Sequence, residues 1–287
     1  MSRKDIDEVS GVETTGHEWD GIKELNNPMP RWWVITFYLT IVWAIGYAIA
    51  YPSIPLLTGS TQGLLGFHSR GELATELAAA NAGQAVFVDK IKAMPLQDIV
   101  ADKGLYEFAL KGGAAAFKVN CAPCHGSGAG GRPGYPNLND NDWLWGGKLE
   151  DIQTTLAHGI RYEADPDTRA SEMPAFGEIL QPEEITQVAS YVVSLTDTPS
   201  DASKVEAGKA LFATNCAACH GDDAKGKREF GAPNLADAIW LKGSGEQAVI
   251  AQVTKPSHGV MPSWGIRLGD ATVKELSIYV HSLGGGE

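Results

Sequence analysis

A continuous apolar run covers residues 32–51, and no charged side chain interrupts it. At the rise of an α-helix, twenty residues span about 30 Å, which is the thickness of the hydrocarbon core of a bilayer. Aromatic side chains stand near both ends of the run, as in the aromatic belts of membrane-spanning helices: Trp32, Trp33, Tyr47 and Tyr51. The pattern therefore predicts one N-terminal transmembrane helix.

The distribution of basic residues predicts the orientation of this helix. Four lysine or arginine residues precede it, whereas Arg70 is the only one between the helix and Lys90. Because basic residues are enriched on the cytoplasmic side of membrane helices, we expect a cytoplasmic, solvated tail over residues 1–31 and an external location for the chain after residue 52. A cleavable signal peptide is the alternative, since Ala48-Ile49-Ala50 resembles a cleavage site. The long acidic region before the run, and the length of the run itself, argue against cleavage.

Residues 52–107 are predicted to form a helical spacer. Ala, Leu and Glu are frequent from Gly71 to Met94, and these residues favour a helix. Pro95 should end that helix, and a second helical run is expected from Leu96 to Leu110, before Gly112-Gly113.

Residues 108–198 and 199–287 repeat one pattern. In each copy, Gly-x-x-x-Phe leads into Cys-x-x-Cys-His, and Pro-Asn-Leu, a Trp, His-Gly, Met-Pro and a closing Tyr-Val-x-Ser-Leu segment follow in the same order. The glycine and phenylalanine suit close packing of the first helix on the last. Pro182 and Asp270 are the expected starts of the two closing helices. The sequence thus predicts a mainly α protein with two tandem domains of one fold.

The two Cys-x-x-Cys-His motifs contain all four cysteines of the chain, and this spacing is the attachment signature of c-type haem. Two such thiols can form thioethers to the two vinyl groups of one porphyrin edge, and the next residue then provides the proximal ligand of the iron. Zinc sites and thioredoxin-like pairs also use Cys-x-x-Cys. However, zinc does not require a His after each pair, and no strand pattern of a βαβ unit lies near either motif. We therefore predict two covalently bound haems c, with these attachment and axial residues: Cys121, Cys124 and His125; Cys216, Cys219 and His220.

Met173 and Met261 are the predicted sixth ligands of the two irons. They are the only methionines within the repeat, and each precedes a proline. A thioether ligand raises the reduction potential and leaves no open position on the iron, which suits electron transfer. His158 and His258 are rivals, but they precede the methionines by 15 residues in one copy and by 3 in the other, so we interpret them as loop histidines. Order along the chain favours the methionine of the same copy for each haem, although adjacent domains could also exchange these loops.

The formal net charge of −12 argues against a nucleic-acid partner. It suits electrostatic steering of a basic protein partner instead. Covalent attachment of haem belongs to the oxidising side of the bacterial membrane, which agrees with the expected orientation. The chain is therefore predicted to be a single-pass protein of the bacterial inner membrane with periplasmic haem domains.

With these features, the chain resembles subunit III of cbb3-type cytochrome c oxidases, a membrane-anchored dihaem cytochrome c. The resemblance covers nearly the full length: acidic tail, single membrane helix, helical spacer and two class I cytochrome c domains. Some relatives have two membrane helices, whereas this sequence has one. The resemblance implies a subunit without the catalytic haem–copper centre. Such a subunit takes electrons from a c-type cytochrome or the bc1 complex and passes them through a monohaem cytochrome c subunit to the catalytic haem–copper subunit, where oxygen is reduced and protons are pumped.

Three other functions remain open on the sequence. A dihaem peroxidase would need one haem with an open or switchable position, and high-spin iron would reveal it. A cytochrome subunit of a periplasmic dehydrogenase would co-purify with a quinoprotein or a flavoprotein. A free-standing membrane-anchored electron shuttle would need no partner, but a simple tether has little use for the helical surface of the spacer.

Overall fold

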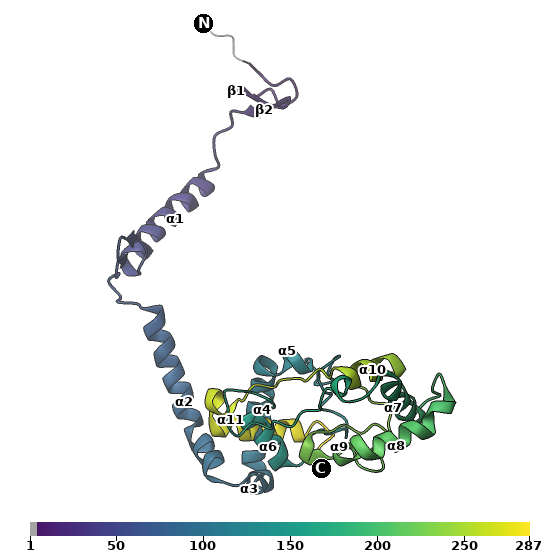
Figure 1. Ribbon diagram of the computed structural model, residues 1–287. Helices are drawn as coiled ribbons and strands as arrows, with labels where there is room; N and C mark the ends of the chain where they lie inside the picture. The colour runs from purple at the N-terminus through teal and green to yellow at the C-terminus, as the bar shows by residue number, and fades with distance from the viewer. Residues whose placement is uncertain (1–4) are drawn as a thin grey trace. The chain divides into compact units, whose positions relative to one another are not determined.

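The computed structural model describes residues 5–287, and the chain is mainly helical, as predicted (Figure 1). It divides after Ala82 into two compact units. The first unit contains the tail and the apolar helix, and the second contains both Cys-x-x-Cys-His motifs.

The predicted tail contains a β-hairpin rather than an irregular segment. β1 (Thr14–Trp19) pairs antiparallel with β2 (Ile22–Leu25), and Asp20 and Gly21 form the turn with φ of 51° and 84°. Positive φ at both central residues is what tight hairpin turns require, and Asp-Gly meets that requirement. This dipeptide is the local signal that the expectation of a plain tail overlooked. Residues 1–4 of the predicted tail lie outside the described part of the chain.

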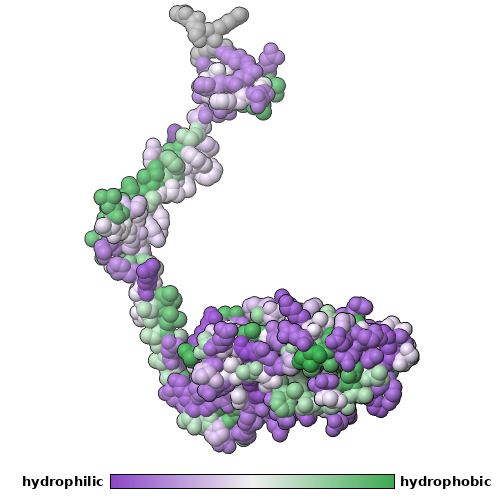
Figure 2. Space-filling model, viewed as in Figure 1, coloured by the Kyte–Doolittle hydropathy of each residue, from purple (hydrophilic) through white to green (hydrophobic). Residues whose placement is uncertain are grey.

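The predicted membrane helix is confirmed as a helix, with bounds shifted by one residue. α1 (Arg31–Ala50) is 20 residues long and has no buried residue. Figure 2 shows hydrophobic residues along its surface. The helix is long and apolar enough to cross a membrane. Lipid would then cover the apolar side chains that the protein leaves exposed.

The chain folds back on the end of α1. The N–H groups of Leu64 and Leu65 donate to the carbonyls of Ile49 and Ala50 at 2.9 and 3.0 Å. These bonds satisfy carbonyls that a helix terminus otherwise leaves without a partner. Two short paired strands lie between, β3 (Pro55–Leu56) and β4 (Gly59–Ser60).

Ten further α-helices follow along the described chain. In order they are α2 (Ser69–Ala93), α3 (Leu96–Ala101), α4 (Lys103–Asn120), α5 (Ala122–His125), α6 (Leu149–His158), α7 (Pro182–Ser194), α8 (Val205–Asn215), α9 (Ala217–His220), α10 (Glu246–Thr254) and α11 (Gly265–His281). Three short 3₁₀ helices connect them, η1 (Phe176–Glu178), η2 (Ala202–Lys204) and η3 (Arg228–Phe230). α7 begins at Pro182, as predicted, and its Gln181 and Glu184 form a capping box.

The second spacer helix was predicted as one run, but it is divided in two. The carboxylate of Asp102 accepts hydrogen bonds from the N–H groups of Gly104 and Leu105 at 2.9 and 3.0 Å, so it caps a new helix, α4. α4 then continues through Gly112-Gly113 to the first cysteine motif. Gly112 and Gly113 lie inside α4 and do not end it. Because they have no side chain, α11 can approach α4 closely at these positions.

The closing helix of the second copy also differs from its prediction. α11 begins at Gly265, and a break at Gly269, with φ of 77°, precedes the long part of the helix. The expected N-cap, Asp270, lies just after this break and pairs with Lys274 at 3.4 Å. The positive φ explains why a glycine occupies the break.

The end of the spacer is built into the second unit. Lys274 on α11 donates to the carbonyls of Ile91, Lys92 and Met94 at 2.8 to 3.1 Å. This cation therefore caps the C-terminal end of α2. A buried apolar cluster joins the same elements: Ile91, Leu96, Ile99, Leu105, Ala109, Ala271 and Ile278.

The first helix of each copy packs on the closing helix of the other copy. α4 lies against α11, and α8 lies against α7 (Figure 1). At Gly113 an added Cβ would collide with the backbone of Glu275, and at Gly208 it would collide with the backbone of Gln187. The glycine contacts expected from the sequence thus form, but between the copies rather than within them.

Glu275 is a buried carboxyl group at the α4–α11 crossing. Its side chain lies over Gly112, and burial raises the pKa of this group from 4.5 to about 7. The folded state therefore binds the proton more tightly than the unfolded state does. As a consequence, the free energy of unfolding falls as the pH rises through the interval between these two pKa values.

We expect Glu275→Gln to abolish this loss of stability. The variant should be more stable than the native chain by about 2 kcal/mol at pH 8. The difference should shrink as the pH falls below 7 and vanish below about pH 4, where Glu275 is protonated in both the folded and the unfolded state. Urea unfolding of the protein at several pH values measures this. Glu178→Gln, at an exposed position, is the control, and a parallel pH profile for both variants would contradict the assignment.

Candidate haem sites

The two Cys-x-x-Cys-His motifs have the same local geometry. In each, a four-residue helix, α5 or α9, ends at the histidine, and a glycine with positive φ follows. The Nδ1 of His125 donates to the carbonyl of Pro136 at 3.0 Å, and that of His220 donates to the carbonyl of Pro233 at 3.2 Å. Because Nδ1 carries the proton, Nε2 of each ring is left as the nitrogen that can bind a metal.

Burial shifts the pKa of the histidines and of one cysteine in each motif. It lowers the pKa of His125 and His220, so both rings are neutral at neutral pH and able to ligate a metal. It also raises the pKa of the Cys121 and Cys216 thiols to about 11.

The surroundings of the cysteines argue against zinc. All four cysteines belong to the described chain and are free. Within residues 5–287, the one group of three or more side chains placed to hold a metal ion contains no cysteine. Each cysteine pair therefore lacks the further ligands of a four-coordinate zinc site. Thioether formation to haem requires only the pair itself.

The predicted sixth ligands lie in the cores of the opposite copies. Met261 packs against the cluster that includes Phe117 and Cys121, whereas Met173 packs against the cluster that includes Phe212 and Cys216. The structure thus brings Met261 to the first cysteine motif and Met173 to the second. This is the exchanged arrangement, which the sequence left open, and the helix packing of α4 on α11 and α8 on α7 has the same exchange.

The repeated tryptophans line the same clusters. Trp143 packs beside the first motif and donates its indole N–H to the carbonyl of Gly285, and Trp240 packs beside the second motif. The two partly buried rings thus add apolar surface beside each cysteine motif, as the binding of a large flat apolar group requires.

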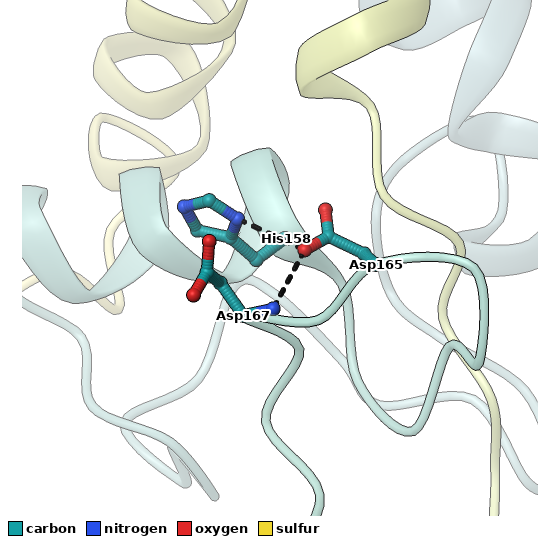
Figure 3. A group of neighbouring side chains, drawn as sticks. All are labelled: His158, Asp165 and Asp167. Atoms are coloured by element: carbon teal, nitrogen blue, oxygen red, sulfur yellow. Dashed lines mark hydrogen bonds and ion pairs between the residues drawn. The ribbon is translucent and has the colours of Figure 1, made fainter.

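His158 is the last residue of α6 and contacts the loop that follows it. Its Nδ1 lies 3.3 Å from a carboxylate oxygen of Asp165, and that oxygen also accepts the N–H of Asp167 at 2.9 Å (Figure 3). The prediction of a loop histidine is therefore wrong in its element, since His158 ends α6 and its ring bonds to Asp165 of the following loop. His258 has a different partner, since its Nε2 accepts the backbone N–H of Met173 at 3.1 Å.

Arg161, Arg169 and Trp145 belong to none of the motifs that the two copies share. The Arg169 guanidinium stacks on the buried Trp145 ring, 5.3 Å from its centroid, and donates to the carbonyl of Asp151 at 3.2 Å. Both arginines lie between His158 and Met173, which are 15 residues apart, whereas His258 and Met261 of the second copy are 3 apart. That unequal spacing was visible in the sequence. It marks an insertion in the first copy, and the contacts of its arginines have no counterpart within the second copy.

Comparisons with known proteins agree with this geometry. The family described as "Cytochrome C oxidase, cbb3-type, subunit III" matches residues 108–192 and 203–280. The family described as "N-terminal domain of cytochrome oxidase-cbb3, FixP" matches residues 11–58. The second match covers both the hairpin and the membrane helix candidate.

Full-length relatives give the same result. The chain is 67% identical over 286 residues to the cbb3-type cytochrome c oxidase subunit FixPc of Rhizobium leguminosarum bv. viciae, with 100% of both chains covered. It is 65% identical to subunit FixP of Rhizobium meliloti, over 99% of this chain and 98% of the relative. It is 50% identical to subunit CcoP of Cereibacter sphaeroides, over 96% and 95%. The chain therefore belongs to the subunit III family of cbb3-type cytochrome c oxidases and is a haem-binding electron-transfer subunit of such an oxidase.

Proposed function

We propose that the chain carries two covalent haems c whose sixth ligands are exchanged between the copies. One haem is attached at Cys121 and Cys124 and bound by His125 and Met261. The other has the reciprocal set: Cys216, Cys219, His220 and Met173. The observation that carries the proposal is the packing of each methionine against the cysteine motif of the opposite copy.

These ligand sets define what each residue does. A haem c supplies one-electron chemistry when bound. The histidines, each fixed by a proline carbonyl, and the methionines would hold the iron, and a thioether ligand would raise its reduction potential. The apolar clusters exclude water from the iron. Such a site moves electrons and offers no open position for oxygen or peroxide, which disfavours the peroxidase alternative.

We place the haem-bearing unit on the periplasmic side of the inner membrane and the N-terminus in the cytoplasm. The distribution of lysine and arginine around α1 supports this orientation. The electrons would come from a c-type cytochrome or the bc1 complex. They would leave through a monohaem cytochrome c subunit toward the catalytic haem–copper subunit, as the family resemblance implies. The names of the relatives as oxidase subunits support such an assembly.

Purification from native membranes in mild detergent tests this assignment. We expect the chain to co-purify with b-type haem, copper and a further c-type subunit. Recovery of the chain alone, with c haem but neither b haem nor copper, would favour a free-standing shuttle instead. A quinoprotein or flavoprotein partner would favour a dehydrogenase.

Haem staining after denaturing electrophoresis tests the number of haems and their covalent attachment. The native chain should retain two haems. The double variant Cys216→Ser/Cys219→Ser and its counterpart Cys121→Ser/Cys124→Ser should each retain one. A native chain that loses its haem on denaturation would contradict thioether attachment.

A further inference from the structure

One guanidinium bridges the loops of both predicted methionine ligands. The Nε of Arg161 donates to the carbonyl of Gly259 at 2.8 Å, and its Nη1 donates to the carbonyl of Ser171 at 2.7 Å. Gly259 lies two residues before Met261, and Ser171 lies two residues before Met173. The Arg161 side chain thus binds, in both loops, the carbonyl of the residue two positions before the methionine.

Backbone and side-chain bonds join the two loops at the same place. Ile160, next to Arg161, exchanges both backbone hydrogen bonds with Met261, at 2.9 and 3.0 Å. On the other side, the N–H of Met173 donates to Nε2 of His258. The loop of each methionine is therefore anchored by residues of the other copy, and Arg161 contacts both loops.

We infer that Arg161 is a positioning residue that couples the sixth ligands of the two haems, an inference that rests on the proposed ligand set. The planar guanidinium presents its donors in a fixed fork, so the separation of the two carbonyls is fixed as well. Removing the fork leaves two partly buried carbonyls without a donor. Both loops then relax together, and both iron–sulfur bonds weaken together.

The local backbone supports a dedicated role for this residue. Arg161 has φ of 50°, a conformation that is uncommon for a residue other than glycine and that persists only where the surroundings impose it. Its own N–H donates to the carbonyl of Arg169 at 2.8 Å, inside the inserted segment. The insertion of the first copy thus delivers the guanidinium to the junction of the two loops.

Three matched variants separate positioning from charge. Arg161→Lys keeps the positive charge but loses the fork. Arg169→Lys makes the same change in the same segment, on a side chain that contacts Trp145 and Asp151 rather than either methionine loop. His258→Ala removes a partner of the Met173 loop alone. Each is compared with the native full-length protein in detergent, loaded with haem.

The readouts are the far-red sulfur-to-iron absorption band and the two reduction potentials from a redox titration. Arg161→Lys should weaken the band and lower both potentials, because methionine ligation raises the potential. A tenfold loss of the preference of sulfur for reduced over oxidised iron corresponds to about 59 mV for a one-electron couple. His258→Ala should lower one potential, and Arg169→Lys should leave both as in the native protein.

Two results would overturn the inference: native values for both haems in Arg161→Lys, or a shift of only one. If that variant fails to bind both haems, Met173→Ala serves instead, because coupling predicts that it also lowers the potential of the haem that Met261 ligates. An unchanged second haem in Met173→Ala would then refute the coupling. The native protein checks the ligand set separately, since absence of the sulfur-to-iron band from either of its haems refutes the proposed ligands and not the bridge alone.

Discussion

Met261→Ala is expected to destroy the sulfur-to-iron band of the haem at His125 and to leave Met173 bound to the haem at His220. The reason is that Met261 packs in the core of the first cysteine motif, although it belongs to the second copy of the repeat. Loss of the thioether should lower the potential of that haem by roughly 0.1–0.3 V, a part of the ~0.8 V range that axial ligands control.

Single-haem backgrounds make this result unambiguous. In Cys216→Ser/Cys219→Ser only the first haem remains, so Met261→Ala should remove the band there and Met173→Ala should not. The reciprocal background, Cys121→Ser/Cys124→Ser, should show the reverse pattern. Circular dichroism and covalent haem content report whether the remaining site is folded. The opposite pattern in both backgrounds would show that each haem takes the methionine of its own copy.

Gly208→Ala should destabilise the haem-bearing unit by up to about 2 kcal/mol. An added Cβ at this position collides with the carbonyl of Gln187 and lies 2.9 Å from the Tyr191 side chain on α7. Overpacking of this kind typically costs about 1–3 kcal/mol. The higher helix propensity of alanine offsets only about 1 kcal/mol of it.

Gly83→Ala is the matched control for this substitution. Gly83 is also a helical glycine, on α2, but nothing lies within 4 Å of an added Cβ there. We expect this variant to be as stable as the native chain or more stable by up to about 1 kcal/mol. Urea unfolding followed by circular dichroism measures both. Equal effects of the two substitutions would mean that the α7–α8 contact is looser than the structure indicates.

Local signals predicted much of this protein. The charge-free run preceding Pro52 predicted α1 to within one residue, and the signals at Pro182 predicted the start of α7. The Asp20-Gly21 turn, which the sequence analysis passed over, belongs to the same class of signal. Such features depend on a few neighbouring residues, so they can be recognised without knowledge of the rest of the fold.

The sequence by itself determined the membrane helix candidate, the start of α7, the two cysteine motifs and the candidate ligands, because each depends on spacing along the chain. Only the tertiary structure decided which elements meet. Both copies close with the same Tyr-Val-x-Ser-Leu segment, so either closing helix offers a similar apolar face to α4 or α8, and pattern alone cannot choose between them. The choice depends on contacts far apart in sequence, such as Arg161 with Gly259 and Ile160 with Met261. These contacts join the inserted segment of the first copy to the second.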